Sequence, residues 1–234
     1  MPVRGGLYSP QAARAVAHSR AIIRAEMTDS GAGEAELREQ DLQADWLGQL
    51  RLWLDDARTS GISEPEAMVL ATADTGARPS ARTVLLKRLD ERGLVFHSNR
   101  QSRKGGELAA NPRAAAVFPW YPIRRQVIVE GAVSLLPDED SDEYFASRPY
   151  RSRIGALASR QSSVIDGRAA LDEARSKFEA RYPEGSPVPR PSWWGGWLIV
   201  PDGVEFWQGR RDRMHDRLRY RRDGAGWIIE RLSP

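Results

Sequence analysis

The stretch from residue 67 to residue 133 constrains the fold most. Short apolar runs alternate there with turn signals: AMVLATA is followed by DTGARPS, RTVLLKRL by DERG, and then comes LVFHS. Such runs, bounded by Gly, Pro, Asp and Ser, are typical of antiparallel strands joined by tight turns. Val127, Val129 and Val133 alternate with polar residues, which predicts a half-buried strand. This stretch therefore indicates a predominantly β domain.

Helical patterns flank and interrupt the strand patterns. Helices are expected over residues 46–57, ending before Gly61, and over 102–110, 138–147, a short stretch opened by Pro149, and 171–182. Strand patterns return in WWGGWLIV, GVEFWQG, residues 218–220 and GWIIERL. About six to eight strands with inserted helices predict an α+β fold, a β-barrel core with a helical edge, in one domain over residues 41–234. Residues 1–40 are expected to be a partly mobile lead-in, with a helix over 11–27 and a link over 28–34.

Composition excludes several classes of chemistry. The chain has no cysteine, which excludes disulfide frameworks, thiol nucleophiles, thiolate zinc sites and iron–sulfur clusters. The three histidines argue against a multi-histidine metal site, so no metal is expected. No apolar run approaches the roughly 18 residues of a membrane span, and no signal peptide is recognised, so we expect a cytoplasmic protein. The phosphate-binding P-loop, the Rossmann glycine fingerprint and the G-x-S-x-G elbow are missing.

Cations stand at strand ends and helix starts. Arg103 and Lys104 open the short helix that follows Ser102, and two cations beside helix N-terminal amides favour an anion site. A solvated helix start explains the pair about as well. Arg82 and Lys87 bracket an apolar strand, and alternation places them on opposite faces, so they serve different partners unless the strand is bulged.

A second polar constellation lies near residue 150. Tyr144, Arg148 and Ser152 are spaced four apart, but Pro149 interrupts a continuous helix. We therefore expect a helix–helix elbow that presents all three side chains to one pocket. Residues 161–163 (QSS) form a polar cluster, for which a cap or a loop is the simplest explanation.

Seven arginines lie between Arg210 and Arg222. They form either a solvated, positively charged strand or loop, or an anion site. Arg213, His215 and Arg217 alternate, so in an extended chain they line one side of a strand as a ligand wall. Trp207, in EFWQG, is by default a core tryptophan.

Taken together, nine motifs resemble one known family. They are RTVLLK at 82–87, SRKGGEL at 102–108, FPW at 118–120, RQV at 125–127, SRP at 147–149, SRQSS at 159–163, EFWQG at 205–209, RMHDR at 213–217 and the terminal ERLSP. In combination they are similar to the pyridoxine (pyridoxamine) 5′-phosphate oxidase family, in register from Leu42 to Pro234. The resemblance implies a homodimeric FMN-binding split β-barrel with the flavin at the subunit interface.

The resemblance also implies roles for individual residues. FMN binding falls to Arg82, Thr83, Val84, Leu85, Leu86, Lys87, His97, Ser98, Arg103, Lys104, Gln126, Gln161, Ser162, Trp207 and Arg217. The substrate phosphate falls to Lys87, Tyr144, Arg148 and Ser152, and the substrate ring to Arg213 and His215. An active-site carboxylate falls to Glu64 and a substrate-covering arginine to Arg24. Three positions depart from the common family residues: Glu64 replaces Asp, Met27 replaces Tyr, and His97 replaces Tyr.

The implied reaction is FMN-dependent oxidation of pyridoxine 5′-phosphate and pyridoxamine 5′-phosphate to pyridoxal 5′-phosphate. The substrate's C4′ carbon gives a hydride to the flavin, and O₂ reoxidises the flavin to yield H₂O₂. The implied partners are the phosphorylated substrate, O₂ and a second copy of the chain, with no nucleic acid and no membrane.

Two alternatives stay open. One is a flavin oxidase of the same fold with another substrate, as in phenazine pathways. The other is a non-catalytic module that binds flavin, pyridoxal phosphate or, through the arginine run, single-stranded nucleic acid.

Overall fold

The computed structural model describes residues 36–234, in which nine strands and five α-helices form one antiparallel unit. The helix expected over 11–27, the link over 28–34 and Arg24 lie outside the described residues. The strands are β1 (Ala67–Ala73), β2 (Pro79–Leu85), β3 (Arg88–Asp90), β4 (Gly93–Asn99), β5 (Arg113–Trp120), β6 (Arg125–Leu135), β7 (Trp194–Gln208), β8 (Asp216–Asp223) and β9 (Gly226–Arg231). The helices are α2 (Trp46–Thr59), α3 (Arg103–Ala110), α4 (Asp138–Ser147), α5 (Tyr150–Ala158) and α6 (Arg168–Arg181).

All nine strands belong to one sheet, whose main path runs β2-β1-β5-β6-β7-β4-β3. The two edge strands of that path, β2 and β3, follow each other in sequence and are linked by Leu86 and Lys87 alone. The Leu86 amide donates to the Glu66 carbonyl, whereas the Lys87 amide donates to the carbonyl of Val95 on β4. The sheet therefore curls until its edges meet, which makes it a barrel.

Strand β7 splits the barrel by changing its neighbour along one edge. Its first half, up to Ile199, pairs with β4, and its second half, from Gly203, pairs with β8, which in turn pairs with β9. Its other edge pairs with β6 from Trp197 to Gln208, with a bulge opposite Gly131. A Cβ on Gly131 would lie 2.0 Å from the carbonyl oxygen of Val200, so this close approach requires glycine.

Side-chain caps explain where helices α2 and α3 begin. The side chain of Asp45 accepts a hydrogen bond from the Gly48 amide and starts α2, whose buried face includes Trp53 and Leu54. Ser102 caps α3 in the same way through the Gly105 amide. Gly105 has no room for a side chain, because a Cβ there would lie 2.2 Å from the Arg100 carbonyl oxygen.

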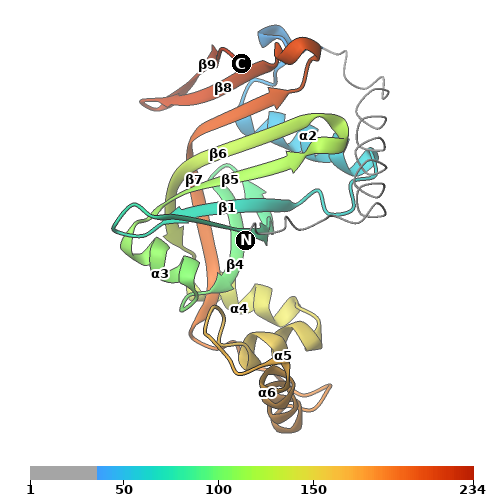
Figure 1. Ribbon diagram of the computed structural model, residues 1–234, viewed down its shortest axis with the longest axis vertical. Coiled ribbons are helices and arrows are strands. Elements are labelled where there is room, and N and C mark those ends of the chain that lie inside the picture. Colours follow the sequence, from blue (N-terminus) through green and yellow to red (C-terminus); the bar gives the residue numbers. More distant parts are fainter. Residues whose placement is uncertain (1–35) are drawn as a thin grey trace, which may run out of the picture. The chain divides into compact units, whose positions relative to one another are not determined.

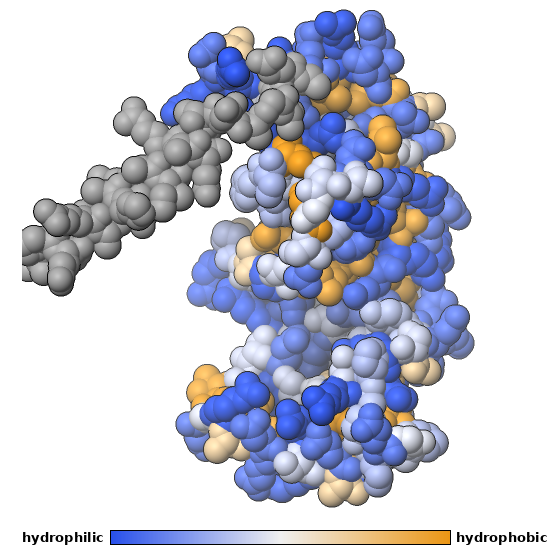
Figure 2. Space-filling view, turned by 90° about the vertical axis from the view of Figure 1, so that its right-hand side faces the viewer, coloured by the Kyte–Doolittle hydropathy of each residue, from blue (hydrophilic) through white to orange (hydrophobic). Residues whose placement is uncertain are grey.

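Two apolar clusters hold the unit together. The larger one fills the barrel and includes Phe96, Phe118 and Phe206. The smaller one, around Phe145 and Trp194, lies under helices α4 and α5. Figure 1 shows α4, α5 and α6 gathered at one end of β7, and β8 and β9 at its other end. On the face seen in Figure 2, hydrophilic residues predominate and apolar ones are scattered in small groups.

The predicted fold class is confirmed, with three differences in detail. RTVLLKRL contains two strands, because the chain changes its partner at Leu86 and Lys87. WWGGWLIV and GVEFWQG belong to the single strand β7, because the bulge accommodates Pro201 without ending the pairing with β6. The described residues hold nine strands, one more than the upper number expected. Within residues 36–234, no helix is both long and apolar enough to cross a membrane.

Candidate active site

A cleft of about 620 Å³ opens between the barrel and the α4–α5 elbow. Of the residues singled out from the sequence, the cleft is lined by Thr83, Val84, Leu85, Lys87, His97, Ser98, Lys104, Tyr144, Arg148, Ser152 and Gln161. They come from the β2–β3 segment, β4, α3, the elbow and the loop after α5. Residues far apart in the sequence thus share one cavity.

Lys104 is the most buried cation of the cleft, with 7% of its surface exposed. Its ammonium donates to Gln161 Oε1 at 2.7 Å, Ser98 Oγ at 3.0 Å and Ser102 Oγ at 3.3 Å. All three acceptors are neutral, and no carboxylate among the described residues pairs with Lys104. Burial and, secondly, the charge of Arg82 lower the pKa of Lys104 to about 8. A buried cation without a counter-ion at a helix N-terminus is a site for an anion.

Arg148 is the second cation of this kind. It lies between α4 and α5, and its guanidinium carbon stands 4.6 Å from the centre of the Trp194 ring. Its buried Nη1 has no hydrogen-bond partner, and burial lowers the pKa of Arg148. Tyr144 and Ser152 line the cleft beside it, as their spacing predicts. The elbow forms because α4 ends at Ser147 and Pro149 caps α5.

His97 lies on β4 against two aromatic rings. Its ring stacks on Tyr144 at 4.1 Å and on Trp194 at 5.2 Å, measured between centroids. Neither ring nitrogen has a hydrogen-bond partner. Burial first, and then the charges of Arg148, Arg88 and Lys87, lower the pKa of His97 to about 4. The imidazole is therefore neutral near pH 7.

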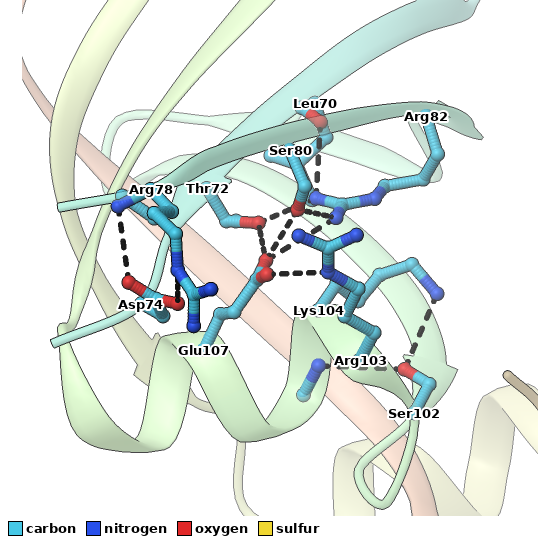
Figure 3. Close-up of polar contacts among 12 residues, drawn as sticks. Leu70, Thr72, Asp74, Arg78, Ser80, Arg82, Ser102, Arg103, Lys104 and Glu107 are labelled. Carbon is cyan, nitrogen blue, oxygen red and sulfur yellow. Dashed lines mark hydrogen bonds and ion pairs between the residues drawn. The ribbon is translucent and has the colours of Figure 1, made fainter. Parts of the chain in front are cut away.

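Arg103 lines an adjoining hollow of about 670 Å³, which shares Gln161 with the cleft, whereas Arg82 lines neither cavity. Ser162 also lines this hollow, with a positive φ of 72°. Both arginines hydrogen-bond to Glu107, a buried carboxylate on α3 (Figure 3). Arg82 thus belongs to the Glu107 contacts, whereas Lys87 lines the cleft, so the two cations lie in different surroundings.

A separate C-terminal group contains Gln126, Trp207, Arg213, His215 and Arg217. Gln126 pairs with Trp207 in the sheet, and the His215 ring lies 4.7 Å from that of Trp207. Trp194 and Trp207 stand near opposite ends of β7, about 40 Å apart along an extended strand. None of the five lines the cleft of its own chain.

The ligand wall expected from alternating Arg213, His215 and Arg217 does not form as one strand face. Residues Arg211–Arg213 form a 3-10 turn, and β8 begins only at Asp216. Asp212 and Arg213 have positive φ values of 58° and 61°, which turn the chain before the strand starts. Arg217 lies on β8 and is paired with Glu205 at 2.8 Å.

Two further predicted residues do not line the cleft. Glu64 is exposed, ahead of β1, and Leu86 is 6% exposed and belongs to the barrel core. Several residues that line or adjoin the site were missed, among them Trp194 in the cleft and Glu107 in the hollow. Of these two, only Glu107 had a signal in the sequence, since it stands four positions after Arg103 on a helix, the spacing of an ion pair.

Comparison with known proteins places this fold and cleft in a class, the FMN-binding split barrels. An FMN-binding protein from Nostoc punctiforme, described as related to pyridoxamine 5′-phosphate oxidase, has the same fold, with a TM-score of 0.66 at 18% identity over 82% of this chain and 99% of that one. PhzG from Burkholderia lata, solved with tetrahydrophenazine-1-carboxylic acid, matches with a TM-score of 0.81 at 31% identity, over 87% of this chain and all of that one.

The chain belongs to the pyridoxamine 5′-phosphate oxidase family. Residues 54–179 match the family of that name, and residues 194–234 match the pyridoxine 5′-phosphate oxidase C-terminal dimerisation region. The pyridoxine/pyridoxamine 5′-phosphate oxidase of Salinispora arenicola is 50% identical over 90% of this chain and 96% of its own length. That of Thermobifida fusca is 52% identical over 90% of this chain and 97% of its own. The resemblance inferred from the sequence motifs is confirmed.

Proposed function

We propose that this chain oxidises pyridoxine 5′-phosphate and pyridoxamine 5′-phosphate to pyridoxal 5′-phosphate, with FMN as cofactor and O₂ as electron acceptor. The observation that carries the proposal is the pair Lys104 and Arg148. Lys104 is buried, Arg148 is half-buried with a buried and unpartnered Nη1, and neither has a carboxylate partner among residues 36–234. Two uncompensated cations on different elements suit two separate phosphates, one on the cofactor and one on the substrate.

The residues present fit a flavin phosphate at α3. Lys104 supplies charge there, and Arg103, on the same first turn, supplies a guanidinium. FMN, when bound, would supply the redox chemistry: it would accept a hydride from the substrate's C4′ carbon while the substrate's hydroxyl or amine loses a proton, and O₂ would take up the two electrons and two protons as H₂O₂. With pyridoxamine 5′-phosphate, water would then hydrolyse the imine product to the aldehyde and release ammonia. The protein's contribution is to bind and orient the two reactants.

The α4–α5 elbow fits the substrate phosphate. Arg148, Tyr144 and Ser152 offer a guanidinium and two hydroxyls, and Lys87 adds a second cation from the β2–β3 link. Trp194 packs against the Arg148 guanidinium and limits its movement. Holding the phosphate end fixes where the substrate's ring lies, which is the entropic part of catalysis.

We further propose a homodimer in which the partner completes the cleft. The match to a dimerisation region covers β7, β8 and β9, with Trp207 on β7, Arg217 on β8, and Arg213 and His215 in the segment between these two strands. Because these residues stand far along β7 from the cleft of their own chain, a second chain is needed to bring them to the substrate.

A substrate comparison tests the proposed function. Purified protein with FMN is assayed for aldehyde and H₂O₂ with pyridoxine 5′-phosphate, pyridoxamine 5′-phosphate and unphosphorylated pyridoxine. We expect kcat/KM to fall at least about 100-fold without the phosphate, because two charge-assisted contacts are lost. Equal turnover with and without phosphate, or turnover only with tetrahydrophenazine-1-carboxylic acid, contradicts the proposal and favours a PhzG-like substrate.

A complementation experiment tests the shared site. Arg148→Ala and Arg213→Ala chains, carrying different tags, are produced together. If the partner supplies Arg213, each hybrid dimer holds one intact site, and random pairing restores about a quarter of wild-type kcat/KM, measured at substrate concentrations far below the raised KM of Arg148→Ala. No restoration above the separate variants contradicts the shared site.

A further inference from the structure

Glu107 collects hydrogen bonds from three elements at once (Figure 3). Its Oε2 accepts from Ser80 Oγ at 2.6 Å, from the Thr72 hydroxyl, and from Arg82 Nη2 at 3.2 Å. Its Oε1 accepts from Arg103 Nε at 2.8 Å. Thr72 and Ser80 stand opposite each other in the β1–β2 pairing, so the two hydroxyls meet the carboxylate as a pair. The carboxylate therefore joins α3 to both strands.

Glu107 stays ionised despite being only 7% exposed. Burial acts to raise the pKa of its carboxyl, but the hydrogen bonds from Ser80, Thr72 and the two arginines outweigh burial and lower the pKa to about 2. A buried carboxylate needs such compensation. One arginine would neutralise it, yet two are present, so the cluster keeps one positive charge.

The two arginines are used differently. All four terminal N–H groups of Arg82 are engaged: Nη1 donates to the Leu70 carbonyl and Thr72, and Nη2 donates to Ser80 and Glu107. Its side chain is 20% exposed. Arg82 is thus locked in place as the counter-ion of Glu107.

Arg103 makes one contact with Glu107, through Nε, and its side chain is 61% exposed. No described residue hydrogen-bonds its two terminal nitrogens. A guanidinium fixed at Nε still presents the edge formed by its two terminal nitrogens, which is the edge that grips a phosphate in a fork. Arg103 lines the hollow described above, and Gln161, which also lines this hollow, accepts a hydrogen bond from Lys104.

We propose that Glu107 is a positioning residue: with Arg82 as its counter-ion, it holds the Arg103 guanidinium in place to bind the cofactor's phosphate. The inference rests on the proposed use of FMN. Glu107 does not touch the cofactor in this account. It removes the rotational freedom of a long exposed side chain before binding, so that less entropy is lost when the phosphate arrives.

The test compares FMN with riboflavin, which lacks the phosphate, by fluorescence titration of cofactor-free protein. We expect Glu107→Gln to weaken FMN binding about 10-fold and riboflavin binding less than twofold. Arg103→Lys, which keeps the charge but loses the Nε contact, is expected to match Glu107→Gln. In an Arg103→Ala background, Glu107→Gln is expected to add less than a twofold loss. Glu230→Gln is the control: it removes a half-buried carboxylate on β9 that pairs with Arg219 and Arg221, and it leaves both affinities unchanged.

Each other outcome overturns the inference. FMN affinity within twofold of wild type in Glu107→Gln or in Arg103→Lys shows that the fixed orientation is not used. Equal losses for FMN and riboflavin, or an undiminished loss in the Arg103→Ala background, show a general structural role. Should Glu107→Gln fail to fold, Arg103→Lys decides alone, because Arg103 is largely exposed. Wild-type protein that binds neither flavin contradicts the proposed function, and this inference with it.

Discussion

Positively charged side chains near the two ends of β7 differ in whether carboxylates neutralise them. At the cleft end, Lys104 is buried and Arg148 half-buried, and neither has a carboxylate partner among the described residues. At the hairpin end, arginines of β8 and β9 are paired across the sheet: Arg217 with Glu205, Arg219 and Arg221 with Glu230, and Arg231 with Asp216 and Glu39.

A high density of arginines in the sequence therefore does not by itself identify an anion site. The arginine run of residues 210–222 is the stronger feature in the sequence, yet in the structure its β8 members largely neutralise neighbouring carboxylates. At the start of α3, by contrast, Lys104 keeps a positive charge that no carboxylate among the described residues neutralises. Unpaired charge identifies an anion site, and only the fold reveals which charges are paired.

The sharpest way to break this comparison is to remove charge at the cleft end. Lys104→Met keeps the length of the side chain but removes its charge. FMN affinity is expected to fall about 10- to 100-fold, as a charge-assisted contact is lost. The melting temperature of cofactor-free protein is expected not to fall, because an uncompensated buried charge disappears. Fluorescence titration and thermal melting measure the two effects, and Lys177→Met on α6 is the matched control. Unchanged FMN affinity would remove Lys104 from the site.

The second test moves to the elbow. Arg148→Met is expected to raise KM for pyridoxine 5′-phosphate about 10-fold or more with little change in kcat, because a phosphate contact is made equally before and during the reaction. FMN stays bound. Steady-state kinetics decide, with Arg151→Met, an exposed neighbour on α5, as the control. A fall in kcat with unchanged KM would place Arg148 at the reacting atoms instead.

The third test measures how the free energy of unfolding depends on pH through His97, at the cleft end. The pKa of His97 is about 4 in the folded protein, below its ordinary value of 6.5. Between these values the unfolded chain binds a proton that the folded chain does not, so stability falls as pH falls from 6.5 towards 4. At pH 5 the loss reaches up to about 2 kcal/mol. Urea unfolding at pH 7 and pH 5 is expected to show a smaller difference in His97→Phe than in wild type. An equal difference in both proteins would contradict the neutral imidazole.

The smallest effect is expected at the hairpin. Arg221→Gln removes one exposed pair with Glu230, and such pairs contribute little. We expect unchanged FMN affinity and KM, and a fall in melting temperature of no more than about 3 °C, smaller still in high salt. A large loss of FMN affinity would erase the contrast between the two ends.

Local patterns predicted most elements of the fold. AMVLATA coincides with β1, and the helix expected over 138–147 coincides with α4, because alternation and helix-ending residues act within a few positions. The elbow that brings Tyr144, Arg148 and Ser152 to one cleft was also predictable, since Pro149 fixes the break between the helices.

What the sequence could not predict depends on contacts between distant segments. The continuity of β7 through Pro201 depends on the bulge opposite Gly131, and that depends on β6. The pairing of Arg217 with Glu205 depends on the register of β7 and β8, and the buried state of Glu107 depends on the β1–β2 pair. The placement of Trp207, Arg213 and His215 relative to a flavin is a property of the proposed dimer.

The neutral oxygens around Lys104 have a calorimetric consequence. With a pKa of about 8, its amine is half protonated at pH 8, and a phosphate bound beside it favours the protonated form. Binding of FMN at pH 8 to 9 therefore draws a proton from the buffer. The heat measured in Tris, which has a large ionisation enthalpy, should differ from the heat measured at the same pH in a non-phosphate buffer of small ionisation enthalpy, and this difference should shrink as the pH falls from 8 towards 7. Binding of FMN at the proposed site is therefore expected to be coupled to the uptake of a proton.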